Sequence, residues 1–166
     1  EEVNSTVSKL RKATDTREAL ALFREHSREE LQSDLDFTAE VFGKAVNGFM
    51  NENLRELRKV LTAVEEKKIH LKQVKRVGTL GVTQLDHDIA VEKGLYYYQG
   101  NDFASEIIFS IRRLAEPMKD HIDNNFSPLS PVQKDDFGKV SEQIISFLRN
   151  CATMIRKNDY IGFEEL

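Results

Sequence analysis

One apolar stripe with the spacing of a helix face runs through residues 82–122 and stays in phase over about eleven helical turns. At 1.5 Å per residue, a helix of this length extends roughly 60 Å. Gly94 and Gly100 lie inside the stripe, and the helical phase of the apolar residues is the same before and after them. If the chain reversed direction at these glycines, the phase would not be expected to continue. We therefore expect one long helix over residues 82–123. Its apolar members are Val82, Leu85, Ile89, Tyr96, Phe103, Ile107, Ile111, Leu114, Met118 and Ile122.

Four patterns typical of helix N-termini divide the rest of the chain. Ser27, Asn53 and Ser130 are each followed three residues later by Glu or Gln, as in a capping box, and residues 15–18 form a weaker fourth case. Apolar residues at steps of three and four follow the first three starts. The patterns predict a turn at residues 78–81 and further helices at residues 3–13, 16–26, 28–50, 54–77 and 131–157.

The fold class follows from these helices and from what the composition lacks. The 166 residues include only 8 Gly and 3 Pro, which leaves few places for the tight turns of a β fold. The sequence also has no segment of useful length in which polar and apolar residues alternate, which is the pattern of a β-strand. We expect an all-α, antiparallel bundle of long helices that forms a single domain over residues 1–166.

Net charge and hydropathy argue against nucleic acid as a partner and against a membrane-spanning segment. The formal net charge of -4 argues against a nucleic-acid-binding domain, which is usually basic. The longest stretch without a charged side chain, residues 124–133, is polar and contains two prolines, so the sequence predicts no membrane span. The chain does not begin with Met, and we expect it to be processed or cut from a longer protein.

Basic and acidic residues are unevenly distributed along the chain. Residues 52–77 carry eight basic and four acidic side chains, whereas residues 82–129 carry four basic and eight acidic ones. One interpretation is that neighbouring antiparallel helices complement each other in charge. The other is that the basic end of residues 67–76 faces an anionic surface such as lipid headgroups or phosphate.

The candidate chemical groups lie mainly in the long third segment. Asp102 and Glu106, and likewise Glu116 and Asp120, are four residues apart and share a helix face, with His121 beside the second pair. Such groups can hold a metal ion, although a highly charged helix also produces carboxylate pairs by chance. The motifs of nucleophilic and nucleotide-dependent enzymes are missing, and we expect no enzymatic activity and no cofactor.

Three runs of sequence point to a family. Residues 92–99 (EKGLYYYQ), residues 102–107 (DFASEI) and residues 116–125 (EPMKDHIDNN) resemble the PhoU-like cytosolic domain attached to certain Pit-type bacterial inorganic phosphate permeases. The resemblance is best over residues 82–155. It implies a bundle of long antiparallel helices, and Asp102 and Glu106 correspond to an acidic metal motif of that family.

The resemblance also implies a function. It predicts a non-enzymatic regulatory domain at the cytoplasmic face of the inner membrane, which gates phosphate uptake by packing against the permease or, as a homo-oligomer, against another copy of itself. The alternatives are a metal-binding helical bundle that uses the acidic and histidine candidates above, and a plain dimerisation or signalling scaffold.

Overall fold

The computed structural model describes residues 16–82 and 87–159, and every regular element within these ranges is an α-helix. The helices are α2 (Thr16–Met50), α3 (Leu54–Val82), α4 (His87–Asp123) and α5 (Pro131–Lys157). They contain 35, 29, 37 and 27 residues. The expected all-α class, with long helices, is confirmed.

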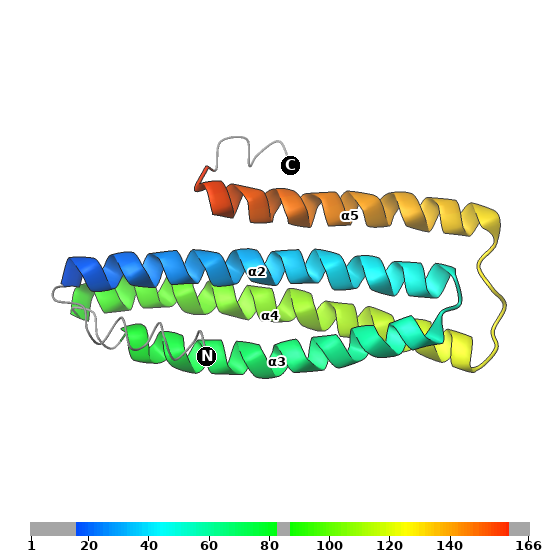
Figure 1. Ribbon diagram of the computed structural model, residues 1–166, viewed down its shortest axis with the longest axis horizontal. Coiled ribbons are helices and arrows are strands. Elements are labelled where there is room, and N and C mark those ends of the chain that lie inside the picture. Colours follow the sequence, from blue (N-terminus) through cyan, green and yellow to red (C-terminus); the bar gives the residue numbers. More distant parts are fainter. Residues whose placement is uncertain (1–15, 83–86, 160–166) are drawn as a thin grey trace.

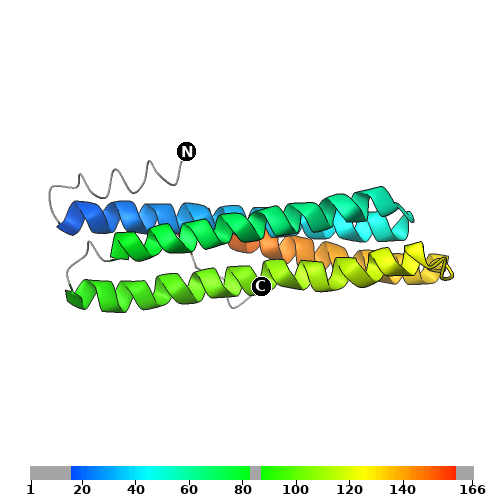
Figure 2. The same ribbon diagram turned by 90° about the horizontal axis from the view of Figure 1, so that it is seen from below.

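Consecutive helices run antiparallel, so that α2 and α4 point one way and α3 and α5 the other (Figure 1). Helices α2, α3 and α4 each pack against the other two and form a three-helix bundle. The backbone of α5 lies beside α2 and beside neither of the other described helices. Seen from below, the long axes of the four helices run nearly parallel (Figure 2). One flank of α5 is therefore left without a neighbouring helix in the described part of the chain.

Among the described residues, two apolar clusters hold this arrangement together. The larger one lies inside the three-helix bundle, where Leu57 and Val64 of α3 meet Ile108 of α4 with almost no exposed surface. The smaller one joins α5 to α2 through Leu35, Ala39, Leu148 and Ala152. Short side chains let these two helices approach closely, and a Cβ added at Gly43 would already lie 3.3 Å from Ile145 Cδ1.

Two of the predicted N-terminal caps are present. Ser130 Oγ accepts a hydrogen bond from the Gln133 amide at 3.3 Å, and Gln133 Oε1 accepts one from the Ser130 amide at 2.9 Å. Pro131 occupies the first helical position of α5, where the missing N–H has no partner to lose. Asn53 Oδ1 caps α3 by accepting from the Glu56 amide at 3.1 Å.

The predicted helix start at Ser27 is wrong, because α2 runs through it without a break. The Ser27 hydroxyl donates to the Phe23 carbonyl oxygen at 2.7 Å, one turn earlier in the same helix. A serine hydroxyl can accept a hydrogen bond from a backbone amide later in the chain, as a helix cap does. Inside a helix it can instead donate one to a backbone carbonyl one turn earlier. The predicted helices 16–26 and 28–50 are thus one helix, α2.

The turn predicted at residues 78–81 is also wrong, because α3 continues to Val82. Glycine lowers helix stability by about 1 kcal/mol but does not forbid the conformation. The long helix α4 begins at His87, not at residue 82, and then continues through Gly100 and Pro117 to Asp123, as one helix. The predicted helix 3–13 lies outside the described residues.

Candidate docking groove between α4 and α5

Large apolar side chains lie exposed along the flanks of α4 and α5. Six such side chains, three on each helix, have between 37% and 69% of their surface exposed. Residues of this size and apolarity are usually covered, and monomers rarely expose apolar patches of more than a few hundred Å². The six are Phe103, Ile107 and Leu114 on α4 and Val140, Ile144 and Phe147 on α5.

Phe103, Ile107 and Leu114 belong to the apolar stripe predicted over residues 82–122, and the three α5 residues belong to the stripe that follows Ser130. In a bundle, both stripes are expected to be buried. On α4 the face that packs into the bundle is instead the adjacent one, which contains Ala104, Ile108, Ile111, Ala115 and Met118. On α5 the face that packs on α2 contains Ser141, Leu148 and Ala152. The prediction of burial is therefore wrong for the six exposed residues, whereas it is confirmed for Ile111 and Met118. Helix α4 consequently has two apolar faces, one buried and one open.

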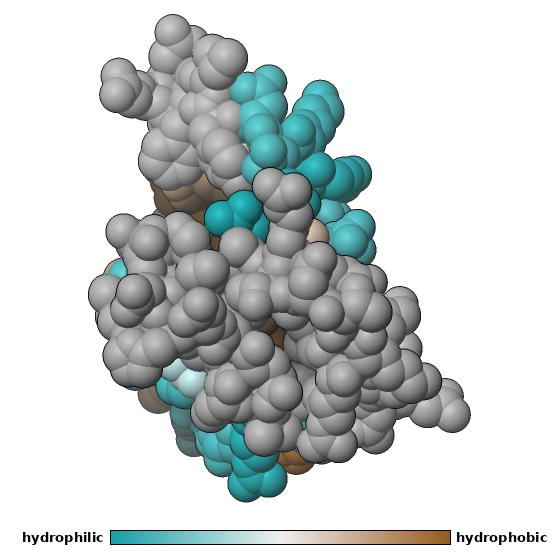
Figure 3. Space-filling view, turned by 90° about the vertical axis from the view of Figure 1, so that its left-hand side faces the viewer, coloured by the Kyte–Doolittle hydropathy of each residue, from teal (hydrophilic) through white to brown (hydrophobic). Residues whose placement is uncertain are grey.

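The two open faces border a single groove. Its walls are α4 and α5, its floor includes Thr38 and Phe42 of α2, and its volume is about 820 Å³. The end-on view shows apolar surface where α5 meets the rest of the molecule, next to hydrophilic side chains (Figure 3). A groove with this apolar lining matches the apolar face of an amphipathic helix.

The chemistry of the groove is that of a packing surface. Of the described residues that line it, none has an ionisable side chain, and the polar ones are Thr38, Ser110, Gln143, Ser146 and Asn150. The Ser110 hydroxyl donates to the Glu106 carbonyl oxygen at 2.9 Å within α4. A serine without a neighbouring base is a weak nucleophile. The arrangement suits burial of apolar surface with a few amide and hydroxyl contacts at its edges.

The predicted metal candidates are spread along α4 rather than gathered. From Asp102 to His121 the helix rises about 28 Å, so one ion cannot reach both ends. Among the described residues, no three His, Cys, Asp or Glu side chains come together as a metal-binding group. The carboxylates instead pair with cations at the surface: Asp102 with Lys75 at 2.8 Å, Glu106 with Arg113 at 3.7 Å, Glu116 with Arg112 at 2.8 Å and Asp120 with Lys119 at 2.6 Å.

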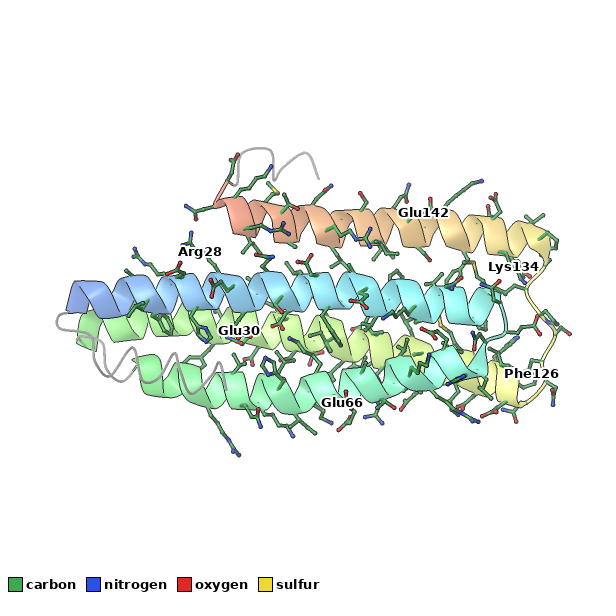
Figure 4. All side chains as sticks on the ribbon, in the orientation of Figure 1. Arg28, Glu30, Glu66, Phe126, Lys134 and Glu142 are labelled. Carbon is green, nitrogen blue, oxygen red and sulfur yellow. The ribbon has the colours of Figure 1, made fainter. Side chains whose placement is uncertain are left out.

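His121 has a packing role at the end of the bundle. Its Nε2 lies 3.0 Å from the Ser127 carbonyl oxygen, and its ring lies 5.3 Å from the Phe49 ring and 5.4 Å from that of Phe126. Figure 4 labels Phe126 in the loop between α4 and α5. The histidine therefore connects this loop to α2.

Charge complementarity between α3 and α4 accounts for part of the uneven charge distribution. Three ion pairs cross from the basic segment to the acidic one: Lys75–Asp102 at 2.8 Å, Arg112–Glu65 at 3.1 Å and Arg58–Asp123 at 3.6 Å. In two of them α3 supplies the cation, and in Arg112–Glu65 it supplies the anion. All of these pairs are exposed, and pairs of this kind contribute little to stability.

Sequence reasoning missed a buried ion pair between α2 and α3. Asp34 is only 2% exposed, and Lys67 Nζ lies 2.6 Å from its Oδ1. Burial raises the pKa of the Asp34 carboxyl above its ordinary value of 3.8, because the cost of removing the charge from water outweighs the attraction of Lys67. Next to this pair, Glu30 points from α2 toward α3, where its Oε2 lies 3.5 Å from His70 Nε2 (Figure 4).

Asp34 could have been found from its spacing. It lies three residues after Leu31 and four before Thr38, both members of the apolar stripe of α2, and so shares the face that packs into the bundle. A carboxylate on such a face needs a cation from a neighbouring helix. The identity of that cation depends on the register between α2 and α3, which the sequence pattern does not specify.

None of the described helices has the length and apolar content that a membrane-spanning helix needs. Comparisons of the chain with known proteins find no match among family models, curated proteins or solved structures. The PhoU-like assignment therefore stays a prediction that rests on the three runs of sequence given above.

Proposed function

We propose that this chain is a non-enzymatic regulatory domain of an inorganic phosphate transporter, and that it acts by packing its helices against the permease or another copy of itself. The observation that carries the proposal is the open groove between α4 and α5. Both of its walls present large apolar side chains, and its lining has no ionisable group among the described residues. Such a surface suits the binding of another helix through its apolar face.

The transporter part of the proposal rests on the sequence resemblance to the PhoU-like domain of Pit-type permeases. The three runs that carry it, residues 92–99, 102–107 and 116–125, lie on α4 or extend just past its end, and α4 forms one wall of the groove. On this proposal the partner is the membrane-embedded permease region, in the same polypeptide, and the domain lies at the cytoplasmic face of the inner membrane.

Phosphate uptake by the intact transporter tests the proposal. The transporter is expressed with this segment, without it, and with Ile144→Asp in the groove, and uptake of radiolabelled phosphate is measured. Val132→Asp is the matched control, because Val132 is an exposed apolar residue of α5 that does not line the groove. We expect deletion and Ile144→Asp to change uptake in the same direction, and Val132→Asp to leave it unchanged. Equal uptake in all four proteins would contradict the proposal.

A further inference from the structure

We propose that the groove receives helix α5 of a second copy of this chain, so that two α5 helices pair antiparallel about a two-fold axis. The inference rests on the proposed function, because it names the occupant of the same groove. It is carried by the juxtaposition of an exposed apolar seam on α5 with an equally exposed wall on α4.

The seam on α5 has the spacing of a coiled coil. Val140, Ile144, Phe147 and Cys151 follow one another at steps of four, three and four, which are the a and d positions of a heptad. This order of steps reads the same in both directions. A reversed copy therefore meets each of these positions with another of them: Ile144 lies opposite the partner's Phe147, and Val140 lies opposite the partner's Cys151.

The polar positions beside the seam also complement a reversed copy. Asp136, Gln143, Asn150 and Lys157 recur every seven residues, all are exposed, and Gln143 and Asn150 line the groove. In the same register Asp136 lies near the partner's Lys157, and Gln143 lies near the partner's Asn150. Neither Asp136 nor Lys157 makes an ion pair with another described residue, so both charges are available for this contact.

The wall on α4 then covers the far side of the incoming helix. Ile107 and Leu114 line the groove, Phe103 lies exposed one turn before Ile107 on the same helix, and α4 runs antiparallel to its own α5. Because a two-fold interface is isologous, each α5 is held between α2 of its own copy and α4 of the partner. One symmetric contact thus covers both exposed stripes on both copies.

Oligomeric state is the first test. Sedimentation of the 166-residue chain should give a dimer, with twice the 19.1 kDa mass of one chain, that dissociates on dilution. Ile144→Asp should be monomeric with unchanged helical circular dichroism, whereas Val132→Asp should remain dimeric. A chain that is monomeric at every concentration, or an Ile144→Asp variant that still dimerises, would overturn the inference.

Disulfide trapping tests the register. With Val140→Cys, the new thiol should form a disulfide with the partner's Cys151, giving a covalent dimer on oxidation. Residues 140 and 151 of one chain are about 16 Å apart along α5, too far for a bond within it. Adding Cys151→Ser should abolish the covalent dimer. A covalent dimer that survives Cys151→Ser would show parallel pairing and would overturn the antiparallel register.

A charge swap gives a second readout. Asp136→Lys should weaken dimerisation about fivefold, because it places two cations together, and Asp136→Lys with Lys157→Asp should restore it. The two residues are about 31 Å apart within one helix, so the rescue can only act between chains. Failure of the double variant to recover would count against the proposed contact.

These results separate the inference from the proposed function. If the chain is monomeric while Ile144→Asp still changes phosphate uptake, the inference fails and the permease itself occupies the groove. If the chain dimerises as described while uptake is indifferent to Ile144→Asp, the inference holds and the proposed regulatory function fails.

Discussion

Replacing Lys67 by Met should destabilise the bundle more than any exposed charge substitution. The variant leaves Asp34, which is 2% exposed, without its cation, while the Met side chain refills most of the Lys67 volume. Removing one partner of a buried ion pair costs about 3–5 kcal/mol. The Lys67 side chain is itself 11% exposed, so some water reaches the site, and we expect a loss of about 3 kcal/mol in the free energy of unfolding.

Urea unfolding followed by circular dichroism measures this loss. Lys139→Met is the matched control, because it breaks an exposed pair with Asp135 one turn away on α5, and it should leave the free energy of unfolding nearly unchanged. The double variant Asp34→Leu with Lys67→Met removes both charges and should recover most of the lost stability, as apolar replacements of buried pairs often do. A double variant as unstable as Lys67→Met alone would refute the ion-pair explanation.

The pH dependence gives an independent check. A carboxyl whose pKa is raised on folding adds stability below its unfolded pKa, and this contribution is lost as the pH rises through the folded pKa. Burial raises the pKa of Asp34, and Lys67 opposes that rise. The deficit of Lys67→Met should therefore shrink as the pH is lowered from about 7 to about 4, when Asp34 takes up a proton. A deficit that does not vary with pH would contradict the reasoning.

Three further predictions follow from the packing. Ile108→Ala should cost about 2–5 kcal/mol in chemical denaturation, because its side chain is fully buried, whereas Phe103→Ala on the open face of α4 should cost far less in the monomer. Ser130→Ala should cost about 1 kcal/mol in the same assay, since it removes the cap of α5, and an unchanged value would show that the cap contributes nothing. Millimolar Mg²⁺, Mn²⁺ or Zn²⁺ should leave the melting temperature unchanged, because the metal candidates on α4 are dispersed, and a rise would revive the metal-binding alternative.

The sequence predicted helix starts and helix continuity correctly where a local pattern is compatible with only one structure. The capping residues Asn53 and Ser130 begin α3 and α5, and the uninterrupted phase across Gly100 predicts a single α4. It was a poor guide at Ser27, where the same pattern fits a cap or a helix interior. Packing decides there, because Phe23 and Leu35, on either side of Ser27, both lie on α2 and are both buried.

The groove itself could not be predicted, for a different physical reason. Periodicity shows which face of a helix is apolar, but it does not show which element covers that face. The stripe through Ile144 on α5 is as regular as the stripe through Val64 on α3, yet Val64 is fully buried and Ile144 is open. The difference depends on how many helices surround each one, which is a property of the assembly rather than of the local sequence.

The central claim, that a second copy of the chain covers the open faces of α4 and α5, is tested most directly by the solvent accessibility of isoleucine methyl groups. Ile107 and Ile144 line the groove, whereas Ile69 is an exposed isoleucine of α3 outside it. Their NMR signals can be broadened by a water-soluble paramagnetic reagent at low and at high protein concentration. The account predicts that Ile107 and Ile144 become protected as the concentration rises while Ile69 stays accessible. Equal broadening of all three at both concentrations would contradict it.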